Sequence, residues 1–326
     1  MFCNQCEQTV KGIACTVSGV CGKKPDVAAL QDLLTYALRG LSKVAFAAGE
    51  AGISDPQVNR FVSKGLFVTL TNVNFDPQSL ADYINQAVRL RQNMVNNLEA
   101  ILQIEGKDDP SLEFVPAGDL QGMHQQGEEV GHLGFTEPDL DKRSLKQTLL
   151  YGLRGVAAYV HHASLLGQED PAVYQFIHQG LTSLTNEGLS MEERLNLILE
   201  CGKINLRAME LLDSGNTKTL GHPEPTSVNL GQRKGKCILV SGHDLLDLKE
   251  LLIQTEGKGI NIYTHGEMLP AHGYPGLKKH PHLAGHYGTA WYNQKREFSR
   301  FPGPILMTTN CIQEPQKTYM DSIYTT

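Results

Sequence analysis

The first twenty-one residues constrain this chain more than any other stretch, because they hold four of its seven cysteines: Cys3, Cys6, Cys15 and Cys21. Thiols this close in sequence are typical of a metal site or of a set of disulfides. Two cysteines separated by two residues can direct both sulfurs toward one centre, and two more complete a four-thiolate cage for zinc or an iron-sulfur cluster. The spacing C-x2-C-x8-C-x5-C matches neither ferredoxin pattern nor a zinc ribbon.

Three occupants of this cysteine loop are open at this point: disulfides, structural zinc and an iron-sulfur cluster. Disulfides need an oxidising compartment, and Met1 and Phe2 lead to Cys3 without a basic or apolar signal segment. We therefore expect a reduced, cytoplasmic chain. Four thiolates also suit a closed tetrahedral zinc site. We favour an iron-sulfur cluster, because sulfur near a chain terminus can pass electrons to a partner.

Length and composition describe an ordinary globular protein. The 326 residues suffice for about two domains, and 40% apolar and 20% charged residues are typical of soluble chains. A formal charge of -6 without a long basic run argues against a nucleic-acid partner. No stretch approaches the roughly 20 consecutive apolar residues of a membrane span. We expect neither nucleic acid nor membrane among the partners.

Residues 26–213, after the cysteine loop of residues 1–25, show helical spacing. Apolar residues recur every three or four positions from Leu30 to Ala45, from Val62 to Leu70 and from Ile84 to Leu102. These three patterns predict amphipathic helices that pack as a bundle.

An internal repeat with an offset of 115 residues organises this helical region. LTYALRGL at 34–41 corresponds to LLYGLRGV at 149–156, and Asp55-Pro56 corresponds to Asp170-Pro171. The repeat predicts two similar helical bundles joined in tandem. Residues 105–131, rich in Gly, Pro and acidic side chains, are predicted to connect them.

The pattern changes after a closing helix predicted over 191–212, in which Cys201 is expected to be a packing residue. Residues 214–235 carry Gly and Pro with little apolar periodicity and are predicted to be a linker. In 236–326 short apolar runs alternate with one helical stretch, so we predict a parallel, doubly wound sheet. Strands are expected at 237–240, 260–263, 282–285 and 304–307, with a helix over 245–257 and Cys237 in the core.

Three potential metal ligands follow predicted strands: His243, Glu267 and Cys311. The carboxyl ends of parallel strands meet at one edge of a sheet, and imidazole, carboxylate and thiolate together suit iron. Each residue also has an ordinary explanation, as a helix start, an exposed carboxylate or a buried thiol. His265 and His272 are candidates for supporting the ligands or transferring protons. No G-x-G-x-x-G or Walker A pattern marks the sheet as a nucleotide site.

Six long motifs are spread over the whole chain: CNQCEQTVKGIACTVSGVCGK, LQDLL, LTNVNFD, SGHDLLDL, QTEGKGINIYTHGEMLPAHGYP and FPGPILMTTNCI. Together they resemble the hybrid cluster protein family, also called hydroxylamine reductases or prismane proteins. The resemblance implies tandem three-helix bundles followed by two Rossmann-like domains. It also implies that the four N-terminal cysteines bind a 4Fe-4S cluster. We therefore expect a multidomain α plus α/β chain, with a cysteine loop, the bundles and a partial Rossmann-like parallel sheet.

The second centre of that family is a hybrid 4Fe-2O-2S cluster bound by one His, two Glu and four Cys. By the resemblance His243, Glu267 and Cys311 correspond to three of these ligands and would be the catalytic residues. The other ligands have no counterpart here, because the sequence ends at Thr326, within the first Rossmann-like domain. We expect the missing half in the same polypeptide or in a separate chain.

The resemblance implies an oxidoreductase that reduces hydroxylamine to ammonia and water, with nitric oxide reduction to nitrous oxide as a second activity. A small nitrogen oxide would be the substrate. An NADH-dependent flavin/iron-sulfur reductase would be the electron donor. The alternative is a catalytically silent electron-transfer or interaction fragment, because only the N-terminal ligand set is complete in this chain.

Overall fold

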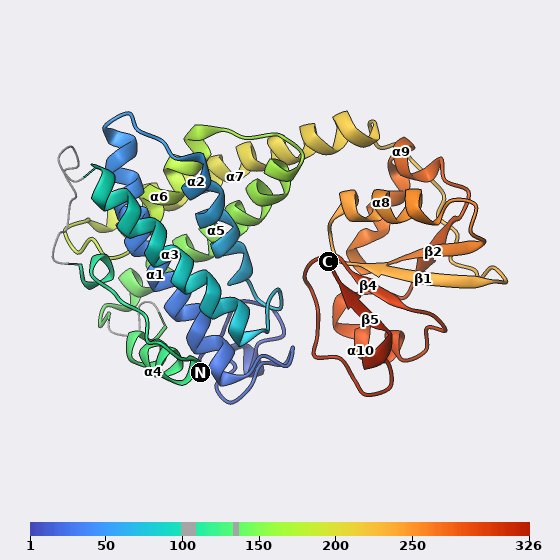
Figure 1. The fold of residues 1–326 in the computed structure, drawn as a ribbon, viewed down its shortest axis with the longest axis horizontal. Coiled ribbons are helices and arrows are strands. Elements are labelled where there is room, and N and C mark those ends of the chain that lie inside the picture. The colour runs from blue at the N-terminus through green and yellow to red at the C-terminus, as the bar shows by residue number, and fades with distance from the viewer. Residues whose placement is uncertain (99–108, 133–136) are drawn as a thin grey trace. The chain divides into compact units, whose positions relative to one another are not determined.

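The computed structural model of the protein describes residues 1–98, 109–132 and 137–326 (Figure 1). These residues form two compact units. Unit 1 comprises Met1–Leu70 and Asn74–Leu212, and unit 2 comprises Thr71–Val73 and Asp213–Thr326. Unit 1 is helical and unit 2 carries a parallel sheet, which confirms the predicted α plus α/β fold class.

The long helices of unit 1 follow the repeat. They are α1 (Pro25–Glu50), α2 (Pro56–Val68), α3 (Pro77–Leu98), α5 (Leu140–Leu165), α6 (Pro171–Ser183) and α7 (Met191–Leu220). Each bound of α5 and α6 lies 115 residues after the corresponding bound of α1 and α2. Asp55 and Asp170 cap α2 and α6 by accepting hydrogen bonds from the first backbone N–H groups, and proline follows each cap. The repeated Asp-Pro pair therefore starts the same helix in both copies.

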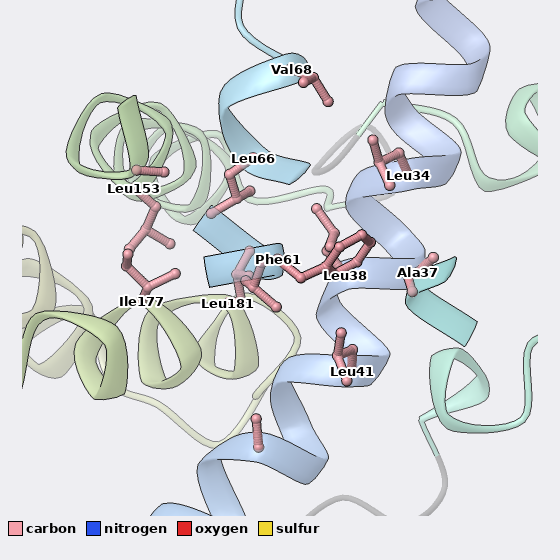
Figure 2. Close-up of a cluster of buried hydrophobic side chains, with 14 of the residues drawn as sticks. Leu34, Ala37, Leu38, Leu41, Phe61, Leu66, Val68, Leu153, Ile177 and Leu181 are labelled. Carbon is pink, nitrogen blue, oxygen red and sulfur yellow. The ribbon is translucent and has the colours of Figure 1, made fainter. Parts of the chain in front are cut away.

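Both copies of the repeat share one apolar core, shown in Figure 2. α1 packs against α6 and α2 packs against α5. Repeat-related glycines bring helices close within each copy. A Cβ at Gly65 would lie 2.9 Å from Leu38, and one at Gly180 would lie 2.7 Å from Leu153. Leu38 and Leu153 are fully buried, and burying one such side chain stabilises a fold by about 1.5–3 kcal/mol.

One helix of unit 1, α4 (Leu120–Val130), lies in the segment 105–131 that was predicted to be a connection. Asp119 caps it through a hydrogen bond from a backbone N–H of the first turn. Gly127 lies against Ala29 of α1, where a Cβ would come 2.3 Å from the Ala29 carbonyl oxygen. The prediction was wrong for this helix because its glycines, which indicated a loop, allow close packing on α1 instead. A short 3-10 helix, η2 (Pro110–Leu112), precedes it.

Helix α7 also differs from the prediction, because it continues to Leu220, past the predicted end at Leu212 and into the predicted linker 214–235. Its polar residues after Leu212 have weak helical preference, but Leu220 is buried in an apolar cluster of unit 2. Packing therefore extends the helix. Cys201 is buried in α7, as predicted. Leu102 of the predicted third helix and residues 105–108 of the predicted connection lie outside the described residues.

Unit 2 is built on five parallel strands in the order β3-β2-β1-β4-β5. They are β1 (Lys236–Ser241), β2 (Ile260–His265), β3 (Leu283–Tyr287), β4 (Ile305–Met307) and β5 (Ile323–Thr325). The first four confirm the predicted strands to within two residues at each end. The sequence did not indicate β5, because this short, mostly exposed edge strand has no apolar run.

Apolar clusters cover both faces of the sheet. Val240 of β1 clusters with Leu248 of α8 (Leu245–Thr255), whereas its neighbour Leu239 clusters with Phe298 of α10 (Gln294–Phe298). Cys237 is only half-buried, against the second cluster. The other elements are η3 (Gly266–Gly273), α9 (Pro275–Lys278), η4 (Trp291–Asn293) and η5 (Met320–Ser322). Across the described ranges, no helix has both the length and the apolar character required to cross a bilayer.

Candidate metal centres

The N-terminal loop brings its cysteines together through backbone pairing. Cys3 and Cys15 lie opposite each other in an isolated antiparallel bridge, and each amide donates to the other's carbonyl oxygen, at 3.1 and 2.8 Å. A 3-10 turn, η1 (Val10–Gly12), lies between them. All four thiols are free; Cys15 and Cys21 are buried, and the other two are half-buried. All four cysteines precede α1, which begins at Pro25, so none of them lies in a long helix.

The pKa of the Cys6 thiol is affected by two of the other cysteines of the loop. Burial raises the pKa of the Cys6 thiol, a hydrogen bond from the Gln8 backbone opposes this rise, and Cys21 and Cys3 raise the pKa further. The last effect arises because neighbouring thiolates repel one another. Cys3, Cys6 and Cys21 therefore lie close enough to interact. A positively charged metal centre would relieve this repulsion when all are thiolates.

The turn before the fourth cysteine requires a glycine. A Cβ at Gly19 would lie 3.0 Å from the Cys21 Sγ and equally close to the Lys23 side chain. Any larger residue would push the thiol out of the loop or shift Lys23. The local sequence thus places the Cys21 sulfur through the small size of Gly19.

Polar contacts tie the turn between Cys3 and Cys6 to the helices. Gln5 Nε2 donates to the carbonyl oxygen of Thr69 at 3.2 Å, and the Tyr151 hydroxyl donates to the side-chain oxygen of Asn4. Arg154, fully buried, donates from Nε to Thr69 Oγ1 at 3.0 Å. Burial raises the pKa of Tyr151 to about 12. Sequence analysis identified Tyr151 and Arg154 only as repeat residues, and nothing in the pattern indicated that they support the cysteine loop.

Four thiols are the ligand type that iron-sulfur clusters use. Within residues 1–98, 109–132 and 137–326, no three Cys, His, Asp or Glu side chains are gathered tightly enough to hold one metal ion as they stand. In a 4Fe-4S cluster each thiolate binds a different iron, so the four sulfurs surround the cluster rather than a single ion. The four free thiols on one paired loop are ligands of the type that such a cluster uses.

The second candidate centre lies at the carboxyl edge of the sheet in unit 2. His243 follows β1, Glu267 follows β2 and Cys311 follows β4. Strand order reverses around β1, which has β2 on one side and β4 on the other. Ligands of doubly wound sheets bind at the carboxyl ends of strands, where the strand order reverses. All three predicted ligands therefore lie at the expected place.

His243 joins the other two loops. Its Nε2 contacts Glu267 Oε2, and its Nδ1 donates to the carbonyl oxygen of Asn310 at 2.9 Å. Its backbone N–H donates to Thr309 Oγ1 at 2.8 Å. The His243 and Glu267 side chains are 35% and 55% exposed. The structure thus brings His243 and Glu267 into direct contact and places Cys311 beside the contacting Asn310.

These contacts orient the imidazole for metal binding. Because Nδ1 donates to Asn310, Nε2, the ring nitrogen that contacts Glu267, is the one left to bind a metal. A metal-bound histidine commonly donates its other ring nitrogen to a backbone carbonyl in this way. The Asn310 side-chain Nδ2 donates a hydrogen bond to Cys311 Sγ, at 3.7 Å. Imidazole, carboxylate and thiolate therefore share an edge at which an iron centre would find three ligands of the types it accepts.

A buried polar chain of Ser241, His265 and Glu297 lies next to the candidate ligands in sequence: Ser241 precedes His243 and His265 precedes Glu267 by two residues. Ser241 Oγ lies 2.9 Å from His265 Nδ1, and His265 Nε2 lies 3.0 Å from Glu297 Oε2. Burial lowers the pKa of His265, and Glu297 opposes this. Burial alone would raise the pKa of Glu297, but hydrogen bonds from Thr289 and His265 hold it below its usual value.

A second buried set surrounds Thr264. Its hydroxyl lies 2.8 Å from His272 Nε2 and 2.9 Å from His286 Nδ1. Burial lowers the pKa of both histidines, that of His286 to about 4. Sequence analysis singled out His265 and His272 but missed Ser241, Glu297 and His286. Only the position of Ser241, two residues before His243 at the end of β1, could have indicated its role.

Comparison with known proteins identifies the family. The model of the Prismane/CO dehydrogenase family matches residues 1–326. This chain belongs to that family. The match confirms the resemblance that the six motifs indicated.

Relatives of this Prismane/CO dehydrogenase family member include proteins named hydroxylamine reductase. The chain is 58% identical to that of Methanocella arvoryzae and 56% identical to that of Syntrophobacter fumaroxidans. Each alignment covers all of this chain and 60% of the relative, so the chain spans three fifths of the relatives' length. Carbon monoxide dehydrogenase IV from Carboxydothermus hydrogenoformans, a solved structure, matches 95% of this chain and 46% of its own, at 16% identity and a TM-score of 0.32.

Proposed function

We propose that this chain provides the electron-entry cluster and three catalytic-cluster ligands of a hydroxylamine reductase. The contact of His243 with Glu267 at the carboxyl ends of adjacent strands, beside the loop of Cys311, is the observation that carries the proposal. This mixed ligand set suits iron. More than half of the aligned residues are identical to those of two relatives that bear this name.

The two ligand sets would hold different clusters. Cys3, Cys6, Cys15 and Cys21 would hold a 4Fe-4S cluster. His243, Glu267 and Cys311 would hold part of a hybrid 4Fe-2O-2S cluster. The remaining ligands would come from the part of the relatives' length that this sequence does not span, either in the same polypeptide or in a separate chain.

When bound, the two clusters supply electrons and an open iron site for a small nitrogen oxide. Reduction of hydroxylamine to ammonia and water consumes two electrons and two protons. The hydrogen bond from Nδ1 to Asn310 holds the His243 ring in one orientation. His265 lies between Ser241 Oγ and Glu297 Oε2 and could pass a proton between these two partners. Glu297 would stabilise the charged ring during this transfer.

The finer assignments follow from the family resemblance. Nitric oxide, reduced to nitrous oxide, is a second candidate substrate. The electron donor would be an NADH-dependent flavin/iron-sulfur reductase that reaches the N-terminal cluster, and the enzyme would act in the cytoplasm. A second candidate function is electron transfer alone, which is favoured by one observation: the thiol set of unit 1 is complete, whereas unit 2 supplies three ligands.

A dye-coupled assay of ammonia formation tests the proposed function. The chain would be assayed alone and co-expressed with the remaining part of the Methanocella arvoryzae relative. We expect turnover of hydroxylamine only in the combined protein and its loss in His243→Ala, because Nε2 is a proposed iron ligand. His222→Ala, a change of an exposed histidine in the same unit, should retain turnover.

Each outcome separates the candidate functions. A combined protein that holds both clusters but never turns over would overturn the reductase assignment. Iron in the chain alone that exchanges electrons with the dye, without ammonia in either preparation, would support the electron carrier. Full activity in His243→Ala would remove His243 from the catalytic site.

A further inference from the structure

We propose that the ammonium group of Lys23 raises the reduction potential of the N-terminal cluster. The inference rests on the proposed function, because it presumes that the four cysteines hold that cluster. Lys23 follows Cys21 by two residues and is 1% exposed. Its Nζ lies 3.9 Å from Cys3 Sγ, within the range of a hydrogen bond to sulfur, and 2.7 Å from Gln31 Oε1.

Lys23 differs from the other buried lysines in the described part of unit 1. Lys43 Nζ lies 3.1 Å from Asp109, and Lys146 Nζ lies 2.8 Å from Glu137, so both ammonium groups have a carboxylate partner. Among the described residues, Lys23 contacts a neutral amide and a thiol. A buried ammonium without an anion is unfavourable, and thiolates around an iron-sulfur cluster provide the missing negative charge.

Gln31 holds the ammonium group in place. Its side chain is buried in α1, and its Nε2 donates to the carbonyl oxygen of Asn74 at 3.2 Å. This bond turns the amide oxygen toward Lys23, where it accepts a hydrogen bond from Nζ. The remaining N–H groups of Lys23 are then available to Cys3 Sγ. The contact between charge and sulfur is therefore fixed by packing and not by a mobile side chain.

A second buried cation, Arg154, also lies near the cysteine loop. Arg39 Nη2 lies 3.4 Å from Asp109, whereas its repeat equivalent Arg154 donates to the hydroxyls of Thr69 and Thr35. In the described part of the chain, Arg154 Nη1 is buried without a hydrogen-bond partner. Arg154 thus makes its hydrogen bonds to hydroxyl groups and not to a carboxylate, and it interacts electrostatically with Cys3 of the loop as well as with Asp32.

The physical effect of such a charge has a definite sign. Reduction adds one negative charge to the cluster, and a nearby buried ammonium stabilises that charge more than it stabilises the oxidised form. A hydrogen bond to the cysteine sulfur acts in the same direction, because it withdraws electron density from the ligand. Lys23 should therefore make the cluster easier to reduce.

An anaerobic redox titration tests the proposal, with iron content measured for every variant. Lys23→Met and Lys23→Gln remove the charge, and Lys23→Arg keeps it. Lys24→Met makes the same charge change at the next, exposed residue. We expect both neutral Lys23 variants to raise the ratio of oxidised to reduced cluster at least tenfold at a fixed potential, which equals a downward shift of about 59 mV. Lys23→Arg and Lys24→Met should stay near the parent potential.

Three results would overturn the proposal. The first is a neutral Lys23 variant with full iron content that titrates at the parent potential. The second is an equal shift in Lys24→Met, since general surface charge would then explain it. The third is loss of iron from both neutral variants, because Lys23 would then serve assembly and not the potential. Absence of iron from the unaltered chain would instead contradict the proposed function itself.

Discussion

The two candidate metal centres are built in opposite ways. In unit 1 all four thiols come from one loop, and backbone hydrogen bonds between Cys3 and Cys15 close it. In unit 2 the three proposed ligands follow three strands that lie far apart in sequence, and the His243–Glu267 pair is partly exposed. A site made within one loop is complete wherever that loop folds, whereas a site at strand ends depends on several parts of a chain.

The largest expected difference between the centres is in iron content. Cys3→Ser should remove nearly all iron from this chain, because the proposed cluster has all four of its ligands in the loop. Cys311→Ser should leave the iron content unchanged, because the three proposed ligands of unit 2 should not hold a cluster without the remaining ligands. Helix content should persist in both variants, since α1 begins after the loop. Iron analysis with far-UV circular dichroism measures both quantities.

Cys201→Ala is the matched control, because Cys201 is a buried thiol of α7 and contacts Gly152. It should keep its iron. Equal iron loss in Cys311→Ser and Cys3→Ser would break the contrast between the centres, and collapse of the helices in Cys3→Ser would show that the bundle needs the loop.

A smaller effect is expected in the helices that support the thiol loop. A Cβ at Gly40 would lie 2.2 Å from the Ser111 carbonyl oxygen, whereas its repeat equivalent Gly155 has open space. Gly40→Ala should lower the free energy of unfolding of unit 1 by about 1–3 kcal/mol. Gly155→Ala should raise it by about 0.5–1 kcal/mol, because alanine favours the helix.

Urea titrations followed by far-UV circular dichroism measure these changes. The fluorescence of Trp291, the only tryptophan in the sequence, reports on unit 2 in the same samples. The urea midpoint of this signal should not change. Equal effects of the two substitutions would contradict the packing difference between the repeat copies.

The smallest expected effect is a difference in acid sensitivity. Burial lowers the pKa of His272, His280 and His286 in unit 2, and it lowers that of His178 in unit 1 to about 4. A histidine with a lowered folded-state pKa binds its proton first in the unfolded state, so stability falls as pH drops below about 6.5. Unit 2 should therefore lose more stability than unit 1.

The experiment compares Trp291 fluorescence with helix content at pH values from about 7 down to about 5, where carboxylates remain ionised. The urea midpoint of the fluorescence signal should fall further than that of the helical signal. A larger fall in the helical midpoint would reverse the predicted order of the two units.

Local patterns in the sequence predicted most of the fold. The Asp-Pro pairs at Asp55 and Asp170 cap their helices, and the repeat offset held for every bound of α1, α2, α5 and α6. The apolar runs predicted four of the five strands. Helix α4 was missed because Gly127 serves packing against Ala29, a contact between segments far apart in sequence.

The residues that surround the two candidate centres were less predictable, because they also meet through contacts between segments far apart in sequence. The ligand candidates follow from residue type and from their positions after strands. The contact of Lys23 with Cys3 requires the loop to fold back on itself, and the chain from Ser241 through His265 to Glu297 requires three separate segments to meet. No periodicity encodes such contacts, because they depend on tertiary packing.

Anaerobic iron and sulfide analysis of the unaltered 326-residue chain tests the central claim most directly. We expect about four irons and four acid-labile sulfides per chain, bound by the N-terminal cysteines. Zinc without sulfide, or a purified chain with no metal after anaerobic reconstitution, would contradict it.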